Sequence, residues 1–335
     1  ASKDLAKSFM KKYGVACAES ETFTDAKQAH DYIDQKGAPI VIKADGLAAG
    51  KGVVVALNAE DAHNAVTEFM EDGKLGNAGS KLVIEEYLSG VEISILAAVS
   101  VTEENASNGK ATIEPFVTAR DHKRLLDGAK GPNTGGMGAI APVSDVTETQ
   151  LSQFKTDILE PTLRGLIAEK MDYRGFIFFG IMLTRNGPKL LEYNVRLGDP
   201  ETQAVLPLMD FDFASMCQAI IDGSLNSFQF KWKNEFAVAP VAVSLGYPAS
   251  YKKGYKISID KEKIANYNGK IFIAGGKTDE NGILVTSGGR VLACSCTAPT
   301  FESAWNNAYK ALECVNFTDM FYRKDIGLPG AAESL

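Results

Sequence analysis

The stretch Leu190-Leu-Glu-Tyr-Asn-Val-Arg-Leu-Gly-Asp-Pro-Glu-Thr-Gln203 carries three polar side chains at alternate positions of an apolar run, namely Glu192, Asn194 and Arg196. Side chains two residues apart on a strand share one face, so the pattern predicts that all three point into one cleft. Oxygen donors beside an arginine suit Mg2+ and the phosphates that it bridges. An edge strand with a polar outer face is the alternative interpretation.

The same stretch continues into a predicted loop. Gly198 and Pro200 interrupt the apolar run, so Asp199 and Glu201 are expected to lie on a loop at the end of the strand.

A second motif, Lys43-Ala-Asp-Gly-Leu-Ala-Ala-Gly-Lys-Gly52, has a lysine at each side of a loop without bulky side chains. Glycine lets backbone N–H groups approach phosphates closely, and lysine supplies a positive charge. The spacing is not that of a P-loop, which requires Ser or Thr where Gly52 stands. A plain hairpin turn between the flanking strands is the alternative.

Polar residues also follow the apolar strand that ends in Glu85-Glu-Tyr-Leu88, with Glu92 close behind. Backbone groups at such a strand end can contact an adenine edge, and a nearby carboxylate can accept hydrogen bonds from ribose hydroxyls. Solvated acids at a strand terminus are the alternative.

Two more motifs flank one segment, 120–142, that is dense in glycine and charge and is expected to be irregular. Asp121-His-Lys-Arg124 offers cationic donors to an anionic substrate, and among the three histidines only His122 lies in such surroundings. Gly131-Pro-Asn-Thr-Gly-Gly-Met-Gly138 resembles a nest of backbone donors that would cradle a phosphate. A solvated charge run and a plain turn are the alternatives.

Length and composition limit the class of protein. The chain has 335 residues, 45% of them hydrophobic and 23% charged, which predicts two or three domains of an ordinary soluble globular protein. The net charge of −7 argues against a nucleic-acid partner. No apolar run approaches the ~20 residues that a membrane-spanning helix needs, so no membrane partner is expected. Five scattered cysteines and the lack of an export signal predict free thiols and a cytoplasmic location.

Apolar spacing and capping residues predict the regular elements. Helices are expected over residues 2–13, 24–36, 58–70, 150–170, 213–222 and 301–315. Strands are expected over residues 39–43, 53–55, 82–88, 175–184, 189–195, 237–245, 256–259, 270–274 and 289–298. The polar segment 103–110 is interpreted as a hairpin turn, and a change to short strands after Trp232 predicts a domain boundary near residue 233.

The order of these motifs is similar to that of the ATP-grasp ligases. More closely, the chain resembles the phosphoribosylamine–glycine ligase family, also called glycinamide ribonucleotide synthetases, from about Ser2 to Gly327. The residues that carry this resemblance are Val41-Ile-Lys-Ala-Asp-Gly-Leu-Ala-Ala-Gly-Lys-Gly-Val53, Asp121-His-Lys-Arg124, Gly131-Pro-Asn-Thr-Gly-Gly-Met-Gly138, Arg196-Leu-Gly-Asp-Pro-Glu201, Ser244-Leu-Gly-Tyr-Pro248 and Arg323-Lys-Asp-Ile-Gly327.

The resemblance implies an α+β ATP-grasp fold in which two subdomains clamp ATP. It implies an ATP-grasp domain over residues 1–232, with a lid subdomain at about 22–90, and a small strand-rich C-terminal domain over 233–335. Family members normally begin with an additional N-terminal substrate domain, which is expected to be absent from this chain. That domain, carried by a separate chain, would then be a partner.

The resemblance also implies roles for individual residues. Glu192 and Asn194 would hold Mg2+, with Mn2+ as an alternative, while Arg196 and Lys123 would be catalytic, Arg196 by stabilising the transferring phosphoryl group. The implied ATP site comprises Lys3, Lys43, Gly50, Lys51, Gly52, Glu85, Glu86, Tyr87, Leu88 and Glu92. The implied substrate site comprises Asp121, Lys123, Arg124, Asn133, Thr134, Gly135, Gly136, Met137, Arg196 and Asp199.

The implied reaction is the ATP-dependent ligation of glycine to 5-phosphoribosylamine through a glycyl phosphate, a step of de novo purine biosynthesis. It needs positioning and charge neutralisation rather than a nucleophilic side chain. Another ATP-grasp carboxylate–amine ligase is one alternative, against which the joint presence of Asp-His-Lys-Arg and Arg-Leu-Gly-Asp-Pro-Glu speaks. A nucleotide-binding module without catalysis is a second alternative, and activity of this chain alone stays open with it.

Overall fold

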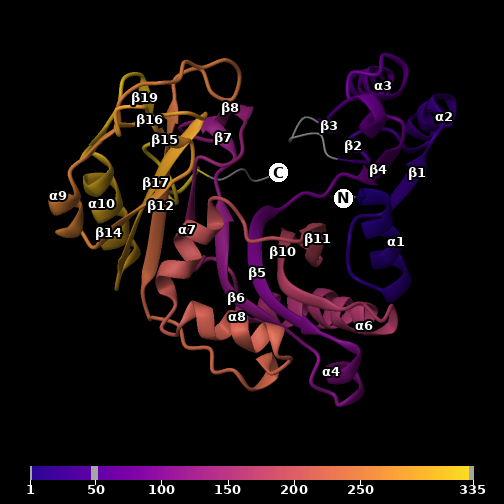
Figure 1. Ribbon diagram of the computed structural model, residues 1–335. Coiled ribbons are helices and arrows are strands. Elements are labelled where there is room, and N and C mark those ends of the chain that lie inside the picture. The colour runs from indigo at the N-terminus through magenta and orange to yellow at the C-terminus, as the bar shows by residue number, and fades with distance from the viewer. Residues whose placement is uncertain (1, 47–51, 332–335) are drawn as a thin grey trace.

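Two antiparallel sheets organise the chain in the computed structural model, which describes residues 2–46 and 52–331 (Figure 1). The smaller sheet has four strands in the order β1-β4-β2-β3. The larger sheet has nine strands in the order β11-β10-β5-β6-β9-β12-β17-β14, with β19 beside β12. The smaller sheet and its helices form a lid at one end of the larger sheet.

The lid has a hydrophobic core of its own, made where two helices cover one face of its sheet. Side chains of Asp25 and Asn58 cap these helices by accepting hydrogen bonds from backbone N–H groups of the first turn. Ile33, Ile42 and Val66 are fully buried between helices and sheet. The lid elements are β1 (Ser20–Phe23), α2 (Ala26–Lys36), β2 (Ile40–Ala44), β3 (Val53–Ala56), α3 (Ala59–Val66), a π-helical turn (Thr67–Glu71), a 3-10 turn (Gly76–Gly79) and β4 (Leu82–Glu86).

The first helix, α1 (Lys3–Tyr13), contacts both the lid strand β4 and the large-sheet strand β11. The hydroxyl of Ser2 caps its first turn, and Gly14 ends it in the left-handed conformation with φ of 72°. Both ends agree with the prediction from sequence. The helix therefore links the lid to the body of the molecule.

The part of the large sheet nearest the lid is covered on both faces. Successive residues of β5 alternate between two cores, with Ile95 packed on one side and Leu96 on the other. Burial on both faces explains why this strand reads as a continuous apolar run. The strands here are β5 (Val91–Val101), β6 (Thr112–Asp121), β9 (Gly138–Ala141), β10 (Tyr173–Thr184) and β11 (Gly187–Asn194). The covering helices are α5 (Glu148–Phe154), a π-helical turn (Lys155–Leu159) and α6 (Glu160–Ala168) on one face, and α7 (Glu201–Val205), 3-10 turns at Leu206–Leu208 and Leu225–Ser227, and α8 (Phe213–Ile221) on the other.

The sheet continues through the expected domain boundary near residue 233. Strand β9 pairs with β12, for example at Ala139 and Ala239, so strands from both sides of the boundary share backbone hydrogen bonds. The remaining elements are β12 (Phe236–Ser244), β13 (Ser258–Ile259), α9 (Lys261–Ala265), β14 (Gly269–Ile273), β15 (Gly276–Thr278), β16 (Leu284–Thr286), β17 (Arg290–Ala298), α10 (Phe301–Leu312), β18 (Val315–Asn316) and β19 (Met320–Phe321).

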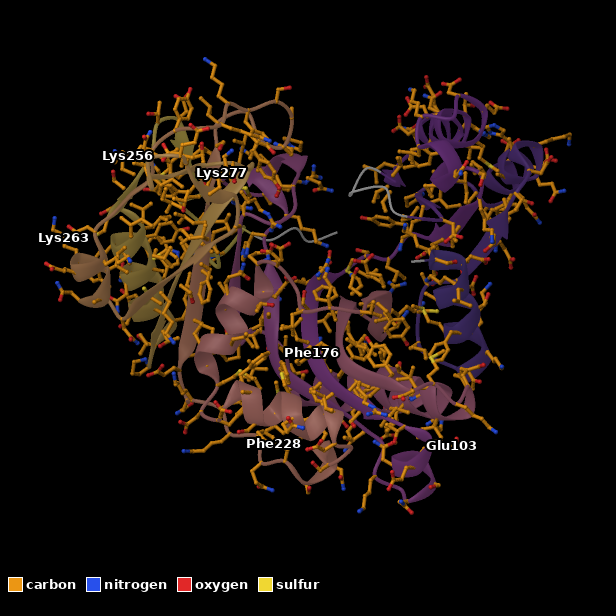
Figure 2. The ribbon with its side chains drawn as sticks, in the orientation of Figure 1. Glu103, Phe176, Phe228, Lys256, Lys263 and Lys277 are labelled. Atoms are coloured by element: carbon orange, nitrogen blue, oxygen red, sulfur yellow. The ribbon has the colours of Figure 1, made fainter. Side chains whose placement is uncertain are left out.

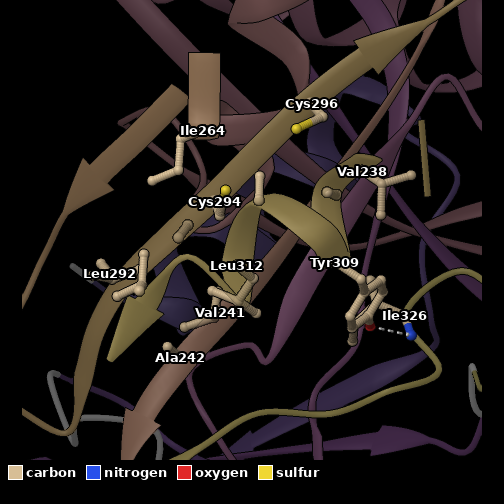
Figure 3. Packing of buried hydrophobic residues seen from close by; sticks show 14 of the residues in the cluster. Val238, Val241, Ala242, Ile264, Leu292, Cys294, Cys296, Tyr309, Leu312 and Ile326 are labelled. Atoms are coloured by element: carbon tan, nitrogen blue, oxygen red, sulfur yellow. Dashed lines mark hydrogen bonds between the residues drawn. The ribbon is translucent and has the colours of Figure 1, made fainter. Parts of the chain in front are cut away.

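Helix α10 packs on β12 and β17 to form the core of the C-terminal part (Figure 3). Cys294 and Cys296 lie on β17 within this core, and the N–H of Ile326 donates to the hydroxyl of Tyr309 at 3.1 Å. All five cysteines are free thiols. Lys256 and Lys263 lie on the side of this part that faces away from the lid (Figure 2). Among residues 2–46 and 52–331, no helix is long and apolar enough to cross a membrane.

The predictions for segments 103–110 and 120–142 are wrong. The segment 103–110 contains a short helix, α4 (Glu103–Ser107), because Thr102 and Asn105 form a reciprocal capping box. The segment 120–142 is not irregular, since it contains the end of β6, the hairpin of β7 (Arg124–Leu126) and β8 (Lys130–Asn133), and β9. These strands are short and glycine-rich, so they lack the apolar alternation from which strands are predicted.

Candidate active site

The site is built around the end of β11, which pairs with β10 in the large sheet and forms a single parallel bridge to Cys17 at Leu190. Glu192 and Asn194 lie on it as neighbours, and the Asn194 amide donates to Glu192 Oε1 at 2.9 Å. The strand ends at Asn194, so the prediction that Arg196 occupies a third alternate strand position is wrong. Arg196 is exposed beyond the strand, and its Nη1 donates to the carbonyl of Leu197 at 2.9 Å.

Two lysines bring positive charge to this strand end. Lys43 lies on the lid strand β2, and its Nζ donates to the carbonyl of Leu191 at 3.4 Å, one residue before Glu192. Lys3 opens α1, and its Nζ donates to the carbonyls of Ala44 and Gly46 at 2.7 and 3.2 Å. Burial lowers the pKa of Lys3, and the nearby Glu192 carboxylate opposes that shift. The lid and the large sheet therefore meet at Glu192.

Behind Lys43 lies a buried charge cluster that the sequence did not indicate. Glu85 is 3% exposed and is paired with two lysines, with Lys43 Nζ at 3.0 Å from Oε1 and Lys7 Nζ at 3.1 Å from Oε2. Lys7 is 4% exposed, and its ammonium also donates to the carbonyl of Ala18 at 3.3 Å. Each carboxylate oxygen of Glu85 is therefore paired with a lysine, and the pair with Lys43 fixes the position of that side chain.

The rest of the predicted hinge follows β4. Glu86 accepts hydrogen bonds from Lys189 Nζ at 2.8 Å and from the Glu19 N–H at 3.0 Å. Tyr87 is half-buried and Leu88 is buried beyond the strand end. In the glycine loop, Gly50 and Lys51 lie outside the described residues, while the Gly52 carbonyl accepts from Ala44 N–H at 2.8 Å.

On the other side of Glu192, Lys123 and Glu92 form an ion pair. Burial lowers the pKa of the Lys123 ammonium, but the Glu92 and Asp121 carboxylates outweigh it and hold the pKa above its usual value. Glu192 adds to the same effect. Lys123 is therefore a permanently charged group beside the strand end, and in this structure Glu92 contacts it directly.

Two carboxyl groups lie beneath this ion pair. Glu201 is buried and accepts from the Ser94 hydroxyl at 2.9 Å; it begins α7 and does not lie on a loop as predicted. Asp121 has one buried oxygen, Oδ1, with no hydrogen-bond partner. Burial raises the pKa of the Asp121 carboxyl well above its usual value, and the Glu201 carboxylate raises it further. The structure therefore holds an acceptor at Asp121 that a bound group would satisfy.

His122 is structural. Its ring is buried, with Nδ1 at 3.2 Å from the Gly138 carbonyl, and its Nε2 accepts from the Gly327 N–H at 2.9 Å. These contacts require the neutral ring, and burial together with the Arg323 charge lowers its pKa to about 4. The imidazole therefore anchors the strand end that carries Asp121 and Lys123 to the C-terminal segment.

The glycine-rich motif folds back over these residues. Thr134 donates both its N–H and its hydroxyl to the carbonyl of Lys123 at 2.8 Å, and Met137 N–H donates to the carbonyl of His122 at 2.8 Å. Arg124 and Asn133 face each other across the β7–β8 hairpin. A Cβ on Gly136 would lie 2.6 Å from Asp121 Oδ1, and the φ of 114° there also favours glycine.

The remaining predicted residue, Asp199, is exposed and contacts Arg290 of β17 at 2.9 Å. Tyr247 also contacts the glycine-rich motif from the C-terminal part. Sequence analysis missed both of these residues, and it missed Lys7. For Tyr247 the only available signal was its place in the motif Ser244-Leu-Gly-Tyr-Pro248.

The donor set at β11 fits a hard cation. A carboxylate and an amide oxygen are ligands that Mg2+ accepts alongside phosphate oxygens and water. The amide nitrogen of Asn194 faces Glu192 in the structure, and turning the amide over would present its oxygen. Among the described residues, no group of three or more His, Cys, Asp or Glu side chains could hold a metal alone. A cation here would therefore need ligand oxygens from a bound phosphate.

Comparison with known proteins gives consistent matches along the chain. Residues 1–202 match the family model described as phosphoribosylglycinamide synthetase, ATP-grasp (A) domain, and residues 237–329 match the model of its C domain. Phosphoribosylamine–glycine ligase from Clostridium acetobutylicum is 49% identical over 326 residues, covering 97% of this chain and 75% of that protein. The corresponding ligase from Neisseria meningitidis serogroup A is 45% identical over 327 residues, covering 97% and 74%.

The comparison with solved structures gives the same family as the sequence matches. The crystal structure of phosphoribosylamine–glycine ligase from Thermotoga maritima matches with a TM-score of 0.82 at 36% identity, covering 97% of this chain and 78% of that one. N5-carboxyaminoimidazole ribonucleotide synthetase from the same organism, with a TM-score of 0.59 and 16% identity over 94% of this chain and 72% of that one, shares the fold alone. The predicted α+β ATP-grasp fold with a small strand-rich C-terminal domain is confirmed.

Proposed function

The chain belongs to the phosphoribosylamine–glycine ligase family, and on that premise we propose that it ligates glycine to 5-phosphoribosylamine with ATP. The products are glycinamide ribonucleotide, ADP and phosphate, and the step belongs to purine biosynthesis. The glycine carboxylate attacks the γ-phosphate of ATP to give glycyl phosphate and ADP. The amine then attacks the acyl carbon, phosphate leaves, and the amine loses a proton as the amide forms.

One observation carries this proposal: a lid lysine and the acidic end of β11 meet at one point. Lys43 Nζ lies 3.4 Å from the carbonyl of Leu191, and Glu192 follows directly. Phosphoryl transfer requires cations on the phosphates and an oxygen site for the metal at the same place. The contact supports a nucleotide bound between the lid and the large sheet.

On the nucleotide side, Lys3 and Lys43 would neutralise phosphate oxygens. Glu192 and Asn194 would hold Mg2+, or Mn2+ in its place, and the bound ion would offset charge that builds up on the phosphates. Arg196 is exposed beyond β11, where its guanidinium would exchange the Leu197 carbonyl for the transferring phosphoryl group. The loop Gly50-Lys51-Gly52 would cover the phosphates and Glu85 to Leu88 would border the adenine. Glu92 would hold the ribose once released from Lys123.

On the substrate side, the charge of Lys123 and the backbone donors of the glycine-rich motif would hold the anionic substrates. Lys123 carries a positive charge because the neighbouring Glu92 carboxylate holds its pKa above the usual value. The buried oxygen of Asp121 would accept from a substrate N–H. Arg124, Asn133 to Met137, and Asp199 would complete this side. The free thiols fit a reducing compartment, which supports a cytoplasmic location.

The test measures ADP release by the purified chain with ATP, Mg2+, glycine and freshly generated phosphoribosylamine, each omitted in turn. Release that requires all four supports the proposal. ATP binding by calorimetry with no release in the complete mixture would contradict it and would favour a nucleotide-binding module. Release without glycine would point to a different acyl substrate.

A further inference from the structure

Arg290 is the first residue of β17, and its guanidinium leaves the C-terminal sheet to contact two loops of the candidate site. Its Nη1 donates to the carbonyl of Gly135 at 2.6 Å and to the carbonyl of Asp199 at 2.9 Å. Its Nη2 donates to Asp199 Oδ2 at 2.9 Å. The planar guanidinium group of Arg290 thus holds together the loops of Gly135 and Asp199, which lie far apart in the sequence.

Tyr247 also binds the loop that contains Gly135. Its hydroxyl accepts from the N–H of Gly135 at 2.8 Å, so both backbone groups of Gly135 are bound by residues of the C-terminal part. A Cβ on Gly135 would lie 3.1 Å from Arg290 Cζ and 3.1 Å from the Tyr247 hydroxyl. Gly289 leaves room for the Tyr247 ring, since a Cβ there would lie 2.2 Å from it. The two side chains are therefore packed together against one glycine.

The loops held in this way border the buried carboxyl group of the site. Gly136, next to Gly135, is so close to Asp121 and Pro200 that a Cβ would lie 2.6 Å from Asp121 Oδ1 and 2.4 Å from Pro200 Cδ. Pro200 follows Asp199. A shift of either loop would therefore change the space around Asp121 Oδ1.

We propose that Arg290 and Tyr247 are positioning residues that set the substrate side of the site from the C-terminal domain. The proposal rests on the proposed ligase function and deepens it. Arg290 fixes Gly135 relative to Asp199, and Tyr247 fixes the orientation of the Gly135 peptide. Neither side chain needs to touch the substrates, because the loops that they hold would do so. The nucleotide side, built from Lys3, Lys43 and Glu192, lies outside their contacts.

The kinetic test uses Arg290→Met, Arg290→Lys and Tyr247→Phe, with each substrate varied separately. Arg290→Met is expected to lower kcat/KM for glycine and phosphoribosylamine roughly hundredfold, the loss that a displacement of about 1 Å causes in a positioned site. The KM for ATP is expected to stay unchanged. Arg290→Lys should recover part of the loss, because lysine keeps the charge but not the fork. Tyr247→Phe should fall between wild type and Arg290→Met.

The matched control is Arg164→Met, the same substitution at an exposed arginine of α6, which should behave as wild type. An equal rise in the KM for ATP, or unchanged kinetics in both Arg290→Met and Tyr247→Phe, would overturn the proposal. So would full recovery by Arg290→Lys, because charge alone would then suffice.

A second measurement does not depend on activity. Hydrogen exchange of the peptide that covers 131–138 should become faster in Arg290→Met and Tyr247→Phe, while exchange in β5 and β10 stays unchanged. Unchanged exchange in the 131–138 peptide would overturn the proposal. If the wild-type chain released no ADP, the ligase function would fail, and this exchange measurement would still decide whether the two residues hold the loop.

Discussion

The buried cluster of Lys7, Glu85 and Lys43 predicts an unequal response to removing its members. Replacing Glu85 by Gln leaves two lysine ammonium groups facing a neutral amide in a site where Lys7 is 4% and Lys43 is 11% exposed. Replacing Lys7 by Met leaves Glu85 paired with Lys43 and puts an apolar chain of similar volume in place of the ammonium. Glu85→Gln should therefore be the more damaging change.

The size of the expected stability loss follows from the two distances between lysine Nζ and the Glu85 oxygens. At 3.0 and 3.1 Å, each pair has a gross Coulomb attraction of about 5 kcal/mol at an effective dielectric constant of ~20. Burial of the charges offsets most of this attraction. The expected loss of unfolding free energy is about 3–5 kcal/mol for Glu85→Gln, since breaking a buried pair strands the remaining charge. For Lys7→Met it is about 1–3 kcal/mol, because the contacts of the ammonium with Glu85 and with the Ala18 carbonyl are lost but no charge is stranded.

The assay is guanidinium-induced unfolding followed by circular dichroism, with the free energy extrapolated at constant m-value. Lys27→Met is the matched control, because Lys27 forms an ion pair with Asp31 at 83% and 61% exposure, where a loss of at most about 0.5 kcal/mol is expected. The double variant Lys7→Met/Glu85→Gln should lose less than the sum of the single losses, because it strands one fewer ammonium. Equal losses in the two single variants, or additivity within about 0.5 kcal/mol, would refute the electrostatic account.

Three further predictions concern the site itself. Glu192→Ala should lower Mg2+-dependent ADP release at least about a hundredfold with the thermal midpoint unchanged, because it removes the exposed carboxylate that we propose as a metal ligand; normal release would contradict the metal assignment, and Glu103→Ala is the control. Lys123→Ala should raise the KM for the anionic substrates more than the KM for ATP, and the opposite order would remove Lys123 from the substrate side. The His122 pKa, lowered from 6.5 to about 4, means that the unfolded chain binds a proton first as the pH falls, so stability is lost below pH 6.5, by about 3 kcal/mol near pH 4. Urea titrations across this range should show a flatter profile in His122→Gln, and identical slopes would contradict the prediction.

The sequence predicted those structural features that depend on residues close together in the chain. The end of α1 and the start of α3 were predicted because Gly14 and Asn58 act within one helical turn. The capping box at Thr102 and Asn105 was equally local, and it was overlooked because Asn replaces the usual Glu or Gln. The pairing of Glu192 with Asn194 followed from the two-residue period of a strand.

The contacts that were missed depend on how distant segments come together. The partners of Arg290 lie 91 and 155 residues away in sequence. Lys7 has the pattern of an ordinary polar residue on an amphipathic helix, and only the lid packed against α1 turns it into a buried charge. The position of Arg196 was wrong because strand periodicity does not say where a strand stops.

The sheet shared across the domain boundary determines how this molecule can be recombined with its relatives. Among the described residues, the lid strands pair with one another, and the hydrophobic core of the lid draws its members from residues 23–84, so an exchanged lid would carry this core with it and would need to keep the Lys7–Glu85 pair. An exchange at the start of β12 would instead have to pair β9 of one parent with β12 of the other, and a mismatch would leave open strand edges that aggregate. Chimeras that exchange the lid should therefore fold. The last third of the chain, in contrast, would have to be exchanged together with the strands that carry the proposed substrate loops.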